Sequence, residues 1–166
     1  MKRCIYAVTL ATTAGMTYGD LMDQIGPDDG SGIGGNIMAS QYFEDAYAQY
    51  SIAVCDNFDT AGSTAVTSLE AVVGGWNGWV DPSGITAYEV NLYSSPDAAG
   101  ASLMGDVGSQ MVDAADAEIS GTWAGANYLI KCNVDLNTAA GTNWVSMIPD
   151  MEFATSGQSG VADSVI

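Results

Sequence analysis

Apolar and polar residues of this chain alternate with a period of two, which is typical of half-buried β-strands. Residues 127–136 show it most clearly, with aromatic and aliphatic residues and Cys132 on one face and Lys131, Asn133 and Asp135 on the other. Residues 85–93 alternate in the same way. Further strands are predicted from β-branched and aromatic content at residues 50–54, 66–73 and 143–148, with 42–47 as a weaker candidate.

Turn-forming residues separate these segments. Clusters of Gly, Ser, Asp, Asn and Pro lie at residues 26–32, 60–63, 81–84, 94–97, 140–141 and 156–160. Helical spacing is not sustained over three turns in any window, and residues 106–119 are expected to form a loop that leads into a strand ending near Ile119. Many short strands with such punctuation predict an all-β fold, an antiparallel β-sandwich of jelly-roll or Ig-like type. The length of 166 residues fits one domain.

The amino terminus has the organisation of a secretory signal peptide. Lys2 and Arg3 precede an uncharged, mostly apolar stretch, and Thr17 and Gly19 are small residues at the −3 and −1 positions of a cut before Asp20. Residues 1–19 are therefore predicted to be a signal peptide, and 20–166 a single sandwich domain. The alternative is that this stretch forms a first strand or a short core helix.

Charge excludes several functions. The chain has 3 Lys and Arg against 20 Asp and Glu, no His, and a net charge of −17. Without imidazole there is no Ser-His-Asp triad and no Cys-His pair. So few cations argue against nucleic acid and anionic membranes as partners. A saline exterior or bound divalent cations would screen such a surface, while acidity for solubility alone is the alternative.

Five segments carry a resemblance to a known group of proteins. They are Asp23-Gln24-Ile25-Gly26, the run from Gly35 to Phe43, Asp56-Asn57-Phe58, Gly74-Gly75-Trp76-Asn77-Gly78, and the run from Val90 to Ser95. With these segments the chain resembles exported β-sandwich proteins of planctomycetes and related environmental bacteria, over about residues 23–153. The resemblance implies an extracellular location and a surface or matrix role.

Members of that group often end in a PEP-CTERM sorting signal. This sequence ends at Ala162-Asp163-Ser164-Val165-Ile166, without a Pro-Glu-Pro motif, a terminal apolar segment or a basic cluster. Two expectations follow: the chain is a piece truncated at its C-terminus, or this member is released instead of anchored.

Cys55 and Cys132 would be the only cysteines left after signal cleavage. In an oxidising exterior they could form a disulfide, which would close a loop of roughly 77 residues and contribute ~4 kcal/mol on the chain-entropy model. Cys132 lies on the apolar face of its predicted strand, whereas Cys55 is out of phase with Ile52 and Val54. Two free thiols are therefore the alternative.

Calcium is the metal that the residue types favour, because only oxygen ligands are abundant. Asp28 and Asp29 lie beside glycines in one predicted loop, and Asp56 and Asp59 form a second cluster with Asn57 at a predicted strand end. Neither has the spacing of an EF-hand loop. The alternative is a solvated turn in which an aspartate caps its own backbone.

A predicted glycine-rich loop carries Trp76, Asn77, Trp79 and Asp81. Exposed indoles stack on pyranose rings while nearby polar side chains bind the hydroxyls, so these residues are candidates for a sugar-binding site. Burial of the tryptophans in the sandwich core is the alternative.

Enzymatic chemistry would depend on a carboxylate pair, such as Glu70 with Glu89, acting on a glycosidic bond. Solvated carboxylates on an outer strand face are the alternative, and no catalytic residue is predicted. We therefore expect a secreted, non-catalytic β-sandwich of the cell surface or matrix. A calcium-assisted carbohydrate-binding module, whose partner would be a surface glycan, is the second expectation, and a glycoside-cleaving enzyme the third.

Overall fold

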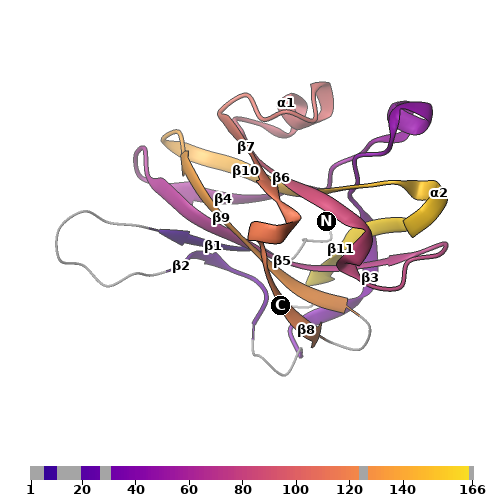
Figure 1. Ribbon diagram of the computed structural model, residues 1–166. Helices are drawn as coiled ribbons and strands as arrows, with labels where there is room; N and C mark the ends of the chain where they lie inside the picture. Colours follow the sequence, from indigo (N-terminus) through magenta and orange to yellow (C-terminus); the bar gives the residue numbers. More distant parts are fainter. Residues whose placement is uncertain (1–5, 11–19, 27–30, 124–126, 165–166) are drawn as a thin grey trace.

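Two antiparallel β-sheets pack face to face in the computed structural model, which describes residues 6–10, 20–26, 31–123 and 127–164 (Figure 1). Every pair of strands is antiparallel, and one isolated bridge, between Tyr42 and Asp150, is parallel. The predicted all-β antiparallel sandwich is confirmed.

The larger sheet has seven strands, and β5 lies at its centre. β9 pairs along one edge of β5, while β1 and β11 share the other edge, β1 beside its first half and β11 beside its end. β2, β3 and β8 lie outermost, paired with β1, β11 and β9. The strands are β1 (Tyr6–Leu10), β2 (Asp20–Asp23), β3 (Ile33–Ala39), β5 (Ala65–Trp76), β8 (Glu118–Trp123), β9 (Asn127–Asn137) and β11 (Gln158–Ser164).

The smaller sheet has four strands in the order β4-β10-β6-β7. Their bounds are β4 (Asp56–Thr60), β6 (Ile85–Tyr93), β7 (Gly108–Asp113) and β10 (Gly141–Met151). The observed limits of β6 are those predicted from the alternation of its residues.

The hydrophobic core lies between the two sheets. Leu69, Ile130, Tyr88 and Met147 are fully buried there, two from each sheet. Burial of every second residue along β9, from Ile130 to Leu136, confirms the predicted apolar face of this segment. Burial of such side chains supplies the main stabilisation, at roughly 25 cal/mol per Å² of apolar surface.

Helices are short and connect the strands. They are the 3₁₀ turns η1 (Asp45–Tyr50), η2 (Pro82–Gly84) and η3 (Ala114–Asp116), and the α-helices α1 (Pro96–Ala101) and α2 (Phe153–Ser156). α1 stands clear of the sheets above β7 in Figure 1. None of the helices in the described part of the chain is long and apolar enough to cross a membrane.

Three predicted elements are wrong. Residues 50–54 form no strand, and Ile52 makes only an isolated bridge to Gln41. Of the weaker candidate 42–47, residues 45–47 belong to η1, and Tyr42 makes only an isolated bridge to Asp150. Residues 106–119, predicted to be mostly a loop, contain β7 and the start of β8. These are edge strands of different sheets that bury few side chains and lack apolar alternation.

β1 falls within the predicted signal peptide; the remainder of residues 1–19 lies outside the described part of the chain. Tyr6 and Val8 are fully buried in the inter-sheet core. The Tyr6 hydroxyl donates to the Val54 carbonyl (2.9 Å) and accepts from the Met147 amide (3.3 Å). Residues 6–10 thus adopt the strand considered as the alternative, and cleavage before Asp20, which would remove this strand, stays a prediction.

Candidate functional site

The predicted sugar-binding residues lie in a tight turn that follows β5. Asn77 and Gly78 both have positive φ angles, 53° and 112°, and the Trp79 amide donates to the Trp76 carbonyl at 3.2 Å. This left-handed backbone reverses the chain within a few residues. Side chains that are close in the sequence therefore leave the turn in different directions.

Trp76 and Trp79 do not form one platform. Trp79 packs against the core and covers the side of Gly75, where an added Cβ would lie 2.6 Å from the indole Cγ. Its Nε1 is buried and has no hydrogen-bond partner among the described residues. Trp76 is half-buried and extends from the opposite face of β5, because successive residues of a strand alternate in direction. Burial in the core, the alternative to sugar binding for these tryptophans, therefore applies to Trp79.

Asp81 has a local structural role. It caps η2 by accepting the Ser83 amide at 2.8 Å, and hydrogen bonds from the Ser83 side chain and amide lower the pKa of its carboxyl group. Asn77 donates its side-chain amide to Gln158, the residue paired with Trp76 across β5 and β11. Of the four candidates, Trp76 and Asn77 thus both adjoin Gln158. Trp79 packs against the core instead, and Asp81 caps η2.

Gln158 also lies beside four aromatic side chains that the sequence analysis did not predict as a site. Phe43, Tyr47, Tyr50 and Phe153 line a groove of about 200 Å³ with it, which we call the aromatic groove. Its sequence signal is the spacing of Phe43, Tyr47 and Tyr50 at i, i+4 and i+7, a helical period in a segment for which a strand is predicted. Phe153 is distant in sequence and could not be assigned to the group by spacing.

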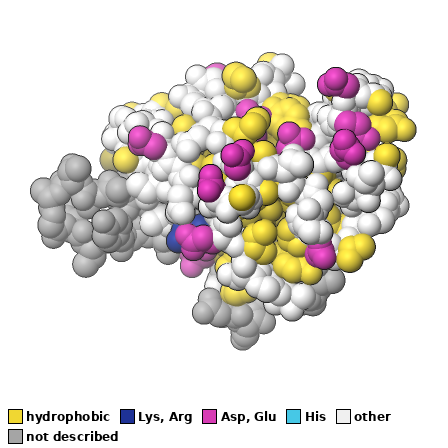
Figure 2. Space-filling view, in the orientation of Figure 1, with side chains coloured by type: hydrophobic (Ala, Val, Ile, Leu, Met, Phe, Trp, Pro, Cys, Tyr) yellow, Lys and Arg dark blue, Asp and Glu magenta, His cyan; other side chains and the backbone are white. Residues whose placement is uncertain are grey.

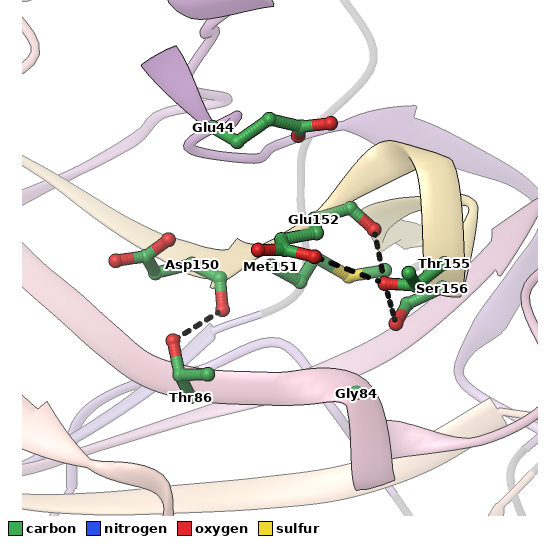
Figure 3. Close-up of a pocket in the computed structure, with 8 residues that line it drawn as sticks. All are labelled: Glu44, Gly84, Thr86, Asp150, Met151, Glu152, Thr155 and Ser156. Carbon is green, nitrogen blue, oxygen red and sulfur yellow. Dashed lines mark hydrogen bonds between the residues drawn. The ribbon is translucent and has the colours of Figure 1, made fainter. Parts of the chain in front are cut away.

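An acidic hollow lies beside the groove, and Figure 3 shows it in detail. It encloses about 450 Å³ and is lined by Glu44, Asp150 and Glu152 together with Thr86, Thr155 and Ser156. Thr86 donates its hydroxyl to the Asp150 carbonyl at 3.2 Å. Because these lining side chains are acidic or hydroxylic, the hollow is unsuited to an anionic ligand.

Two carboxyl groups of this hollow have opposite pKa shifts. The amide of Phe153 donates to Glu44 at 2.8 Å and lowers the pKa of that carboxyl group, whereas burial raises the pKa of Asp150. An acid and base pair requires such a difference and also convergence on one substrate atom. In Figure 3 the two carboxylates point in opposite directions, so the second condition is not met by these two side chains.

Glu70 and Glu89, the carboxylate pair considered for glycoside cleavage, lie on opposite outer faces of the sandwich. Glu70 alternates with core residues Leu69 and Ala71 on β5, and Glu89 alternates with core residues Tyr88 and Val90 on β6. Both side chains therefore point away from the core that separates the two sheets. This pair cannot act on one glycosidic bond, and that part of the enzyme expectation is corrected.

Two of the four predicted calcium ligands, Asp56 and Asp59, are described by the structure and are not brought together. Asp56 is buried and Asp59 exposed on β4, three residues apart and hence on opposite faces. Asp59 accepts the Thr142 hydroxyl at 2.6 Å. Asp28 and Asp29 lie outside the described residues. Within the described ranges, no three Asp, Glu or Cys side chains form a group able to hold a metal ion.

Cys55 and Cys132 are free thiols in the structure. Burial raises the pKa of Cys55 to about 11 and that of Cys132 to about 12. Cys132 is fully buried in the core as its place in the alternation indicated, and Cys55 is half-buried just before β4. At neutral pH both groups are protonated and weakly nucleophilic.

Comparisons with family models, with curated proteins and with solved structures each found no match to this chain.

Proposed function

We propose that this protein is a secreted, non-catalytic β-sandwich that acts at the cell surface or in the extracellular matrix. The observation that carries the proposal is the divergence of its carboxylates: Glu70 and Glu89 point away from opposite sheets, and Glu44 and Asp150 point apart. Since the sequence has no histidine, carboxylates are the main candidates for proton transfer, and neither of these two pairs converges on a common point.

Secretion is supported by the arrangement of residues 1–19 and by the resemblance to exported sandwich proteins. Cleavage before Asp20 would remove β1 and leave the first half of β5, residues 66–71, without a neighbouring strand on that edge. The proposal therefore includes a mature chain that remains folded through β9, β11 and the smaller sheet. β9 pairs with β5 from Ala65 to Val73, and β11 pairs with its end, so two of the three neighbours of β5 would remain.

The test is expression of the full chain in an exporting bacterium, followed by N-terminal sequencing of the protein from the exterior. The expected product starts at Asp20 and shows the circular dichroism of a folded β-protein. An intact chain found only in the cytosol would contradict secretion. Turnover of glycosides by the purified product would contradict the non-catalytic role.

A carbohydrate-binding module is the second candidate. The observation in its favour is that the half-buried Trp76 lies beside the hydrogen-bonded amides of Asn77 and Gln158, an indole with polar groups at its edge. A glycan array with calcium or with EDTA tests it. We expect any specific glycan signal to disappear in Trp76→Ala and to persist in Ile119→Ala, an exposed apolar residue on β8. A signal that survives Trp76→Ala would remove this site.

A further inference from the structure

Four aromatic rings gather on the surface where η1 meets α2. Phe43 precedes η1, Tyr47 and Tyr50 belong to it, and Phe153 begins α2. Tyr47 and Tyr50 have 39% and 64% of their surface exposed, although both are large side chains next to an open groove. We propose that the aromatic groove binds a quaternary ammonium group, the trimethylammonium head of a small organic cation.

The aromatic rings lie at large angles to one another and form adjoining sides of the groove. The Phe43 and Phe153 rings have centroids 6.2 Å apart at 61°, and the Tyr47 and Phe153 rings have centroids 5.7 Å apart at 82°. A groove of about 200 Å³ with walls in several orientations suits a compact, rounded group better than an extended flat one. Ring faces attract a cation through their quadrupole, and methylated ammonium groups are bound in this way.

The charge around the groove favours a cation. Glu44 and Asp45 follow Phe43 in the chain, and Glu152 precedes Phe153, so three acidic residues adjoin the ring-bearing residues along the chain. Glu44 also accepts the Phe153 amide. Lys131 is the one basic side chain among the described residues, and it lies 3.7 Å from Glu118. Figure 2 shows acidic groups scattered over the visible face with one small basic patch. The field at the groove is therefore negative, and an anionic ligand is disfavoured.

The lining offers few hydrogen bonds. Among the side chains that line the groove, Gln158 alone carries an amide, and its Oε1 already accepts from Asn77. The remaining polar atoms of the lining side chains are the Gln158 Nε2 and the hydroxyls of Tyr47 and Tyr50. A sugar needs several donors and acceptors for its hydroxyls, whereas a quaternary ammonium group needs none.

The groove is held open by its surroundings. Glu44 accepts the Phe153 amide at 2.8 Å and the Ala154 amide at 3.4 Å, which fixes α2 against the segment that leads into η1. Since the walls are in place before binding, little ordering free energy opposes the ligand.

The test is calorimetric titration of the full chain with choline and with its neutral carbon isostere, 3,3-dimethylbutan-1-ol. We expect choline to bind about tenfold more tightly, the range of a desolvated cation–π contact. Binding should weaken at high sodium chloride, because part of the attraction comes from Glu44, Asp45 and Glu152. Tyr50→Ala, at an exposed position, should remove most of the affinity, and Asp45→Asn should reduce it severalfold.

Ile119→Ala provides the control, since it removes another exposed apolar side chain, on β8. Equal affinities for choline and the isostere would overturn the proposal and leave a plain apolar groove. Folded protein that binds neither would overturn it too, and would show that the rings only fasten η1 to α2. Displacement of choline by neutral sugars with equal strength would assign the groove to carbohydrate instead. None of these results depends on whether the protein is secreted.

Discussion

Glu44 joins two segments that lie 109 residues apart, through its hydrogen bonds from α2. The pKa of Glu44 is lowered in the folded state, so its stabilising effect is present above the ordinary pKa of about 4.3 and is lost as the pH falls through the folded value. We expect Glu44→Gln to be less stable than the wild type at neutral pH, and the difference to shrink in acid. Urea denaturation across this pH range measures it.

The neighbouring Glu152→Gln is the matched control. Glu152 is exposed, and its carboxylate receives only a long hydrogen bond, 3.5 Å, from the Thr155 hydroxyl. We expect its variant to differ little from the wild type at any pH. A constant difference between Glu44→Gln and the wild type from neutral pH into acid would show that the carboxylate charge is not what holds α2.

The two cysteines allow a prediction about the redox state. Their raised pKa values and burial predict slow alkylation at mildly alkaline pH in the native protein, with Cys55 reacting before the fully buried Cys132, and rapid alkylation of both in urea. Mass spectrometry after timed iodoacetamide treatment measures this. Protein exported through an oxidising compartment that carries no alkylatable thiol in urea would instead establish the disulfide.

At the scale of elements, the contact between β5, β11 and the following turn depends on Gly75. A Cβ at this position would lie 2.1 Å from the Gln158 carbonyl oxygen and 2.8 Å from the Trp79 Cβ. We expect Gly75→Ala to lower the free energy of unfolding by about 1–3 kcal/mol, because backbone and indole must shift. Gly121→Ala on β8 is the control, since a Cβ added there would have no neighbour within 4 Å among the described residues. Equal stabilities, measured by thermal denaturation, would contradict the close packing.

The contribution of β1 can be measured through Tyr6. Tyr6→Phe leaves the Val54 carbonyl and the Met147 amide without this buried partner, and we expect a loss of about 1–3 kcal/mol in the full chain. Tyr50→Phe, at an exposed position, should have little effect. A Tyr6→Phe variant as stable as the wild type would show that these two hydrogen bonds contribute little to holding β1 against the smaller sheet.

For the whole molecule, net charge is the dominant electrostatic property. A charge of −17 on 166 residues produces self-repulsion that salt screens, with a Debye length of ~10 Å at 0.1 M and about 3 Å at 1 M. We expect the Tm to rise as sodium chloride increases. An unchanged or falling Tm would contradict this. A further rise with calcium chloride at equal ionic strength would support the calcium prediction, which then needs ligands beyond the separated Asp56 and Asp59.

The sequence by itself determined the fold class, the limits of β6 and the buried face of β9, because a period of two is a local property of a strand. It also determined the absence of imidazole chemistry. Only the tertiary structure decided that Trp76 and Trp79 point in different directions and that Glu70 and Glu89 face away from each other. It also decided that the ring of Phe153 packs against that of Tyr47. The physical reason is that successive side chains of a strand point to opposite faces, which local spacing reveals. Contacts between residues a hundred positions apart depend on which strands pair and how the two sheets pack, and local spacing does not determine either.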